Sequence, residues 1–130
     1  MKTVYTILLG TFLAFTLACG YGSKNYNTGT SNMPAIAQLN PSSTTHGDAA
    51  FTLTVNGSNF ATKAVVNWNQ TAQTTTYVTN GQVTIAVPAA AIASAGSVQI
   101  TVTNPATSGG GYGGGGTPAQ TSNSMTFTIN

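Results

Sequence analysis

Alternation of apolar and polar residues runs through most of the chain after Pro34 and limits the folds available to it. Phe51, Leu53 and Val55 alternate with polar residues, so that one face of this segment is apolar and the other is polar. Successive side chains of a β-strand point to opposite faces, and this period of two therefore predicts a half-buried strand rather than a helix. The same pattern recurs in residues 64–68, 83–87, 98–103 and 125–129.

Weaker segments complete the set of expected strands. An opening strand at 36–39 and a threonine-rich strand at 74–78 bring the total to about seven, as in an immunoglobulin-type sandwich. Asn56-Gly57 and Asn80-Gly81 are predicted to form tight turns with positive φ angles. We therefore predict an all-β, immunoglobulin-like β-sandwich over residues 34–130.

Trp68 and Ile92 are two further apolar residues that are expected to belong to the core. Trp68 continues the apolar face of Ala64 and Val66, which predicts that it is the largest residue of the core. The alanine-rich segment 89–96 follows Pro88 and is expected to form at most one helical turn, with Ile92 pointing inward. No cysteine pair is available to join the two sheets, so hydrophobic packing must hold them together.

The chain is almost free of charge, and this restricts its chemistry. Charged residues make up 3% of the sequence, against roughly a quarter in ordinary soluble proteins, while the apolar fraction of 41% is sufficient for a core. The acids consist of Asp48 alone and the histidines of His46 alone. Paired-carboxylate catalysis and a protein-bound metal both need more ligating or titrating groups than these, so we expect no enzyme, no cofactor and no metal site.

Two further function classes can be weighed from the same residues. A hydrolase would have to rest on His46 and Asp48, which stand close together in a turn-like stretch and are better read as solvated loop residues. Nucleic-acid binding needs a basic patch, but residues 19–130 contain only Lys24 and Lys63 as basic side chains and no arginine. We expect no nucleic-acid partner.

The N-terminus is typical of an export signal. A positive start at Lys2 precedes an apolar run over residues 4–18, which is shorter than the roughly 20 residues of a membrane-spanning helix. The run stops at Cys19, the only cysteine of the chain. Leu17-Ala18-Cys19-Gly20 resembles a bacterial lipobox, although Thr16 stands where leucine is usual. Ordinary signal cleavage that leaves a free thiol is the alternative.

The lipobox resemblance implies a domain organisation and a location. Residues 1–18 are expected to form a lipoprotein signal peptide, and Cys19 is expected to carry the lipid that anchors the mature chain to a membrane. Residues 19–33 are rich in Gly, Asn, Ser and Thr, a composition typical of a flexible tether. The protein is then exported and anchored at the outer membrane or the cell surface.

The body of the chain resembles the IPT/TIG family of immunoglobulin-like domains. The resemblance covers about residues 34–130 and depends on eight short pieces in the family's order, each of them weak alone. They are Pro34-Ala35-Ile36, Leu39-Asn40-Pro41-Ser42, residues 51–55, Gly57-Ser58-Asn59-Phe60, Val66-Asn67-Trp68-Asn69, Val87-Pro88-Ala89, residues 98–105 and residues 124–129. Two departures are Gln70, where a glycine commonly follows the asparagine, and a long connection after Pro105.

That resemblance implies a binding or spacing module with no catalytic residue. We expect a lipid-anchored envelope module that binds an unknown protein or envelope polysaccharide through loops and edge strands, or that pairs with itself through an edge strand. The alternative is a carbohydrate-binding module with Trp68, Tyr77 or Tyr112 as stacking platforms. The glycine run 109–116 lacks the Lys-Ser/Thr and helix of a phosphate loop, and it is expected to be flexible, with Tyr112 as a candidate contact residue.

Overall fold

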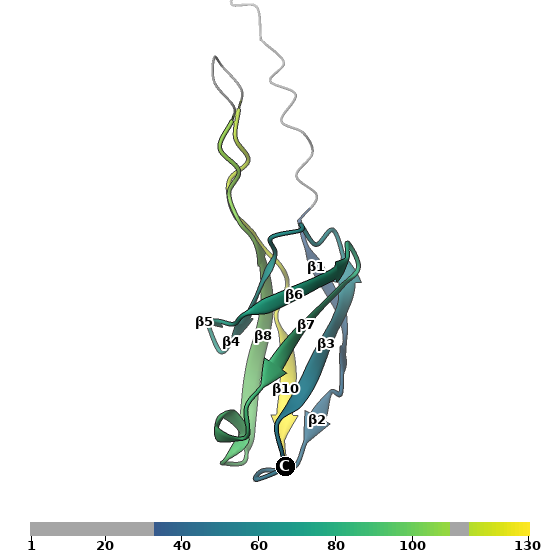
Figure 1. Ribbon diagram of the computed structural model, residues 1–130, viewed down its shortest axis with the longest axis vertical. Coiled ribbons are helices and arrows are strands. Elements are labelled where there is room, and N and C mark those ends of the chain that lie inside the picture. The colour runs from purple at the N-terminus through teal and green to yellow at the C-terminus, as the bar shows by residue number, and fades with distance from the viewer. Residues whose placement is uncertain (1–32, 110–114) are drawn as a thin grey trace, which may run out of the picture.

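The computed structural model describes residues 33–109 and 115–130, and these form an all-β sandwich of two sheets (Figure 1). The predicted signal peptide, the predicted tether up to residue 32, which includes Cys19, and Tyr112 lie outside the described residues. Within the described ranges, no helix has the length and apolar character that crossing a membrane requires. The predicted fold class is confirmed.

The first sheet is antiparallel and has the order β1-β3-β7-β6. Its strands are β1 (Ala35–Asn40), β3 (Phe51–Ser58), β7 (Gln82–Val87) and β6 (Thr75–Thr79). The second sheet has the order β2-β10-β8-β4-β5, with β9 paired to the end of β8. Its strands are β2 (Ser43–Thr44), β10 (Met125–Ile129), β8 (Gly96–Asn104), β4 (Val65–Trp68), β5 (Thr71–Ala72) and β9 (Gln120–Thr121).

The alternating residues supply the core, as the sequence predicts. In β3, Leu53 and Val55 are fully buried, whereas Thr52 between the apolar positions is exposed. The inward-facing residues of both sheets meet in one cluster, and the core therefore arises from the period-two pattern itself. Its buried members are Ile36, Leu39, Leu53, Val55, Phe60, Ala64, Val66, Val83, Ile85, Val87, Ile92, Val98, Ile100, Val102, Phe127 and Ile129.

Trp68 lies less deep than predicted. Phe127, rather than Trp68, is the largest fully buried side chain, and Trp68 is only partly buried against the core. Its ring lies 5.4 Å from that of Phe127 at a tilt of 49°. Trp68 is the last residue of β4, next to the hairpin that leads to β5, and a side chain at the end of a strand is covered by fewer neighbours than one in the middle.

The predicted asparagine–glycine turns are wrong in their backbone torsions. Gly57 lies within β3, where a Cβ atom would collide with the carbonyl oxygen of Ala35, so glycine is needed for close approach of β1. Asn80-Gly81 does turn β6 into β7, but neither residue has a positive φ. The hairpin with two residues at positive φ is β4–β5, at Asn69 (49°) and Gln70 (71°).

Two of the connections between the sheets have a distinctive local structure. The cis Asn40–Pro41 peptide lies where the chain leaves β1 in the first sheet and enters β2 in the second. The expected helical turn is present as a 3₁₀ helix, η1 (Ala89–Ile92), and it buries Ile92 completely as predicted.

A narrow ribbon projects from one end of the sandwich, beyond β8 and β9 (Figure 1). Its two arms are joined by the amide of Thr107, which donates to the carbonyl of Thr117 at 2.9 Å, and by their hydroxyls at 2.8 Å. The chain enters β1 at this same end, whereas the C-terminus lies at the opposite end (Figure 1). The described arms of this connection are paired with each other, where the sequence predicts only a flexible loop.

Candidate binding surfaces

His46 and Asp48 stabilise the connection between β2 and β3. The Oδ2 atom of Asp48 accepts hydrogen bonds from the Thr44 hydroxyl at 2.9 Å and from the Thr45 amide at 3.0 Å. The Nδ1 atom of His46 lies 2.8 Å from the carbonyl oxygen of Asn130. Both side chains are exposed and engaged in local structure, which favours the loop-residue interpretation over a hydrolase.

The described residues offer little to a metal ion. Nowhere in residues 33–109 and 115–130 do three or more His, Cys, Asp or Glu side chains gather as a metal-binding group. The surfaces that remain for binding are the edges of the two sheets and the hollows between their loops. An exposed strand edge presents main-chain donors and acceptors to any strand-like partner.

The outer edge of β1 is guarded by a side chain from the connection between β9 and β10. The Asn123 amide oxygen accepts the hydrogen bond of the Ile36 N–H at 2.8 Å, and its amide nitrogen donates to the Ile36 carbonyl at 3.0 Å. A single carboxamide thus replaces the two bonds that a neighbouring strand would make. A register shift at Ala37 and the proline at position 41, which has no N–H, interrupt the same edge further along.

The edges of the second sheet are short or already occupied. The outer side of β4 pairs with β5, and beyond β5 the Val66 carbonyl accepts from the Gln73 amide at 2.9 Å. The Val66 N–H donates to the Thr75 hydroxyl at 2.8 Å. The two outermost strands of this sheet, β2 and β5, have two residues each, and very short edge strands are poor templates for pairing.

The remaining edge is β6, and its outer side is open in the described structure. Among the described residues, no side chain bonds to the main chain of Thr76, Tyr77 or Val78. No charged residue lies on this strand. Val78 is 48% exposed and Thr76 is also exposed, while Tyr77 packs against the core from the inner face. A register shift between Tyr77 and Thr79 interrupts the pairing of β6 with β7 at Val78, as one at Ala37 does in β1. What this edge lacks is a side chain bonded to its main chain, the guard that Asn123 provides at β1.

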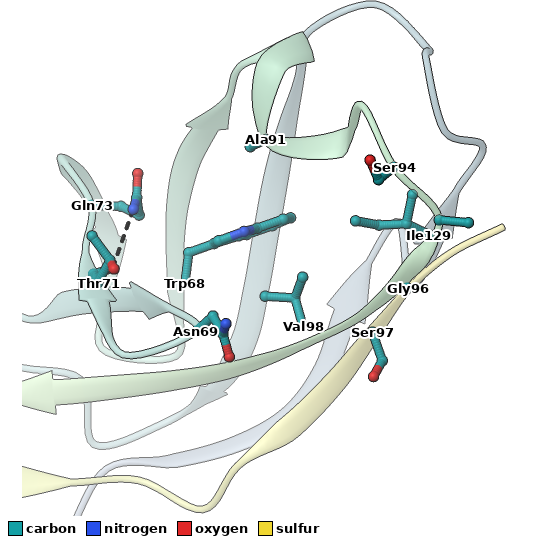
Figure 2. Close-up of a pocket in the computed structure, with 11 residues that line it drawn as sticks. Trp68, Asn69, Thr71, Gln73, Ala91, Ser94, Gly96, Ser97, Val98 and Ile129 are labelled. Atoms are coloured by element: carbon teal, nitrogen blue, oxygen red, sulfur yellow. Dashed lines mark hydrogen bonds between the residues drawn. The ribbon is translucent and has the colours of Figure 1, made fainter.

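Trp68 lines a shallow groove of about 480 Å³ between the β4–β5 hairpin and the start of β8 (Figure 2). Gln73 and Thr71 form one wall, where the Gln73 amide nitrogen donates to the Thr71 carbonyl at 3.1 Å. The close-up shows Ser94 and Ser97 on the far side of the indole from this wall. The lining carries no charge, and its full set is Trp68, Asn69, Thr71, Gln73, Ala91, Ser94, Ala95, Gly96, Ser97, Val98 and Ile129.

The three predicted aromatic platforms are not brought together among the described residues. Trp68 reaches the groove, whereas Tyr77 packs inward from β6 and is absent from the groove lining. Tyr112 lies outside the described residues, as does Cys19. A sugar at this groove would therefore meet one aromatic ring and neutral polar side chains.

Sequence reasoning missed the asparagines that act as main-chain partners. Besides Asn123, Asn104 accepts from the Ala61 amide at 2.9 Å and donates to the Asn59 carbonyl at 2.8 Å. Asn104 is 9% exposed, and it is the buried polar residue that joins β8 to the loop before β4. The position of Asn104 in the sequence gives one indication of this role. It falls on the buried face of β8, at the end of the alternation of buried and less buried residues.

The strand order and the core agree with a comparison against protein families. A model of the IPT/TIG domain matches residues 34–129, which is most of the chain. Comparisons with curated proteins and with solved structures gave no match. The family is a non-catalytic, immunoglobulin-like one, and the two-sheet sandwich described above has its architecture. This chain belongs to the IPT/TIG domain family.

Proposed function

We propose that this protein is a lipid-anchored, non-catalytic module of the cell envelope that binds a partner through the outer edge of β6. The observation that carries the proposal is the contrast between this open, uncharged edge and the guarded edge of β1. Membership of the IPT/TIG family supports a binding or spacing role. The chain's single aspartate and single histidine are both engaged in one connection, which supports the absence of catalysis.

The anchor is Cys19. Support for it comes from the sequence, because an apolar run that stops at the only cysteine of an exported chain is typical of a lipoprotein signal. Several acyl chains on one residue are sufficient for stable attachment to a membrane. The protein is then held at the outer membrane or the cell surface by residues 19–33, with the sandwich standing off the bilayer.

Metabolic labelling tests the anchor. A fatty-acid analogue should label the wild-type chain in bacteria, and the chain should sediment with membranes. Cys19→Ser should lose the label and leave the membrane fraction, while Ser23→Ala, a matched change in the tether, should retain both properties. An unlabelled wild-type chain in the soluble fraction would contradict the lipid anchor.

Salt dependence tests binding through a strand edge. Main-chain hydrogen bonds between strands change little with ionic strength, unlike contacts between exposed charges. Crosslinked complexes of the full chain in intact cells should therefore persist in 0.5 M salt, about three times physiological ionic strength. A complex that dissociates in high salt would favour contacts between charged groups. The absence of any complex under all conditions would favour a passive spacer.

A second candidate function is binding of a neutral carbohydrate at the Trp68 groove. The observation that favours it is a partly buried indole among uncharged amide and hydroxyl groups, which suits the apolar faces and hydroxyls of a sugar. Neutral oligosaccharides should shift the fluorescence of Trp68, the only tryptophan. Gln73→Ala should lower the oligosaccharide affinity measured by this fluorescence titration. Gln38→Ala, an exposed position on the distant strand β1, should leave the affinity unchanged.

A further inference from the structure

We infer that the occupant of the β6 edge is a second copy of this chain, paired antiparallel about a two-fold axis. This inference rests on the proposed edge binding and names the partner. It follows from the number of open edges, the absence of charge on β6 and the exposed side chains that the pairing would cover.

The number of open edges determines what kind of assembly can form. An isologous contact uses the same surface on both copies and closes after two, whereas a chain with two different sticky edges can continue into a fibre. Among the described strands, β1 is guarded by Asn123, and β2 and β5 are too short to template a partner. One open edge therefore predicts a closed pair, in which two four-stranded sheets become one continuous sheet.

The lack of charge on β6 fits a copy of itself. In a two-fold antiparallel pair, a strand faces its own sequence, so a charged residue would lie near its like-charged equivalent, and directly opposed like charges are destabilising. The sequence of β6 is Thr-Thr-Tyr-Val-Thr. The charged residues of the described part are Asp48, in the connection after β2, and Lys63, in the loop before β4. Neither lies on the pairing strand.

The exposed side chains of β6 complement each other when the axis passes at Tyr77. Antiparallel pairing centred there places Thr76 of one copy opposite Val78 of the second copy, and the two-fold axis repeats this pair. Val78 stands at the register shift between Tyr77 and Thr79, so the regularly paired part of β6 is Thr75–Tyr77. Both are β-branched and exposed, and cross-strand pairs of this kind stabilise sheets. Val78 is one of two large hydrophobic side chains exposed in the described residues, and pairing would cover it.

The pairing is short, and the membrane makes it effective. A contact over the five residues of β6 falls in the class of small interfaces, which form weak or transient complexes. Two copies anchored by lipids in the same bilayer meet at a raised effective concentration, and such confinement strengthens weak contacts without new ones. We therefore expect pairing of the anchored chain and little pairing of the dilute protein in detergent.

Disulfide crosslinking of co-expressed full-length chains tests the register. One tagged chain carries Thr76→Cys and a differently tagged chain carries Val78→Cys. Opposed residues in antiparallel strands have Cα atoms about 4.5–5.5 Å apart, within the range that disulfides span. Mild oxidation of isolated membranes should join the two tags. The matched control is Ala35→Cys with Ala37→Cys on β1, where both positions are exposed and the edge is guarded.

The results separate this inference from the proposal on which it rests. The β6 cysteine pair should crosslink about tenfold more than the β1 cysteine pair. In a second experiment, Val78→Lys in one chain and Thr76→Lys in the other replace the cysteines. These opposed lysines should reduce co-purification of the two tags about tenfold. Equal crosslinking of the two pairs, or crosslinking of β6 only to other proteins, would overturn the inference. Crosslinking of the wild-type chain through Cys19 would instead contradict the lipid anchor.

Discussion

The two edges of the first sheet differ in how their main chains are satisfied. At β1, the Asn123 side chain makes hydrogen bonds to both the N–H and the carbonyl of Ile36, at 2.8 and 3.0 Å. Pro41, which has no N–H, directly follows the strand. At β6, one side-chain hydrogen bond joins the strand to the second sheet among the described residues, and it is made by Thr75, where the strand begins. A protein with few charges cannot guard its edges with lysines, so it guards one with an amide and leaves the other open.

The largest expected effect comes from removing the guard of β1. Asn123→Ala deletes both hydrogen bonds to Ile36 and should lower the free energy of unfolding by about 2–3 kcal/mol. Denaturant unfolding of the detergent-solubilised full chain, followed by Trp68 fluorescence, measures this. Gln38→Ala, an exposed side chain on the same strand, should change stability by less than about 0.5 kcal/mol. Equal losses in the two variants would remove the assigned role of Asn123.

The same variant should change the assembly as well as the stability. With β1 opened at Ile36, each copy has a second edge available there, and association can continue beyond a pair. Crosslinking of Asn123→Ala in membranes should therefore yield a ladder of species larger than the dimer. A variant that is destabilised as expected but still stops at the dimer would show that the β1 edge is blocked by more than Asn123.

A smaller loss is expected where β6 is joined to the second sheet. Thr75→Val keeps the shape of the side chain but removes the hydroxyl that accepts the Val66 N–H and donates to the Gln73 carbonyl. Because Val66 is fully buried, its N–H would lose its partner, and unfolding should become easier by about 1–2 kcal/mol. Thr76→Val, one residue along with an exposed side chain, should be close to neutral. A neutral Thr75→Val would mean that other contacts hold β6 in place.

The smallest effect is a gain at the hairpin that occupies the outer side of β4. Gln70 has a φ of 71°, a left-handed conformation that costs most L-residues energy and costs glycine little. Gln70→Gly should raise the free energy of unfolding by about 0.5–1 kcal/mol. Asn69→Gly is the control, since asparagine tolerates its φ of 49° and should gain less. A loss of stability in Gln70→Gly would show that the glutamine side chain contributes contacts worth more than the strain.

The alternation of side chains was sufficient to predict the sandwich, because it is a local property of each strand. The buried faces of β3, β7, β8 and β10 are the ones the sequence indicates. The two-residue strands β2, β5 and β9 were missed. Pairing with segments distant in the sequence defines β2 and β9, and β5 is too short to show an alternating pattern. The depth of Trp68 also depends on neighbours from η1 and β8 that no local pattern reveals.

The edges were harder to predict than the core. The sequence suggested that charge is too scarce to protect every edge, but it did not indicate which edge is open. That distinction depends on Asn123 meeting Ile36 across 87 positions of the chain. The positive φ angles were misplaced for a related reason, because the tertiary path of the chain puts the strain on Asn69 and Gln70 rather than on the asparagine–glycine pairs.

Amide hydrogen exchange compares the two edges directly in the full-length protein. In dilute detergent solution, the Ile36 amide should exchange slowly because Asn123 accepts its hydrogen bond, and the outward amides of Thr75–Thr79 should exchange rapidly. In membranes where the anchored chain is dense, the β6 amides should become protected while those of β1 stay unchanged. Protection of β6 already in the dilute protein, or new protection confined to β1, would contradict the assignment of β6 as the binding edge.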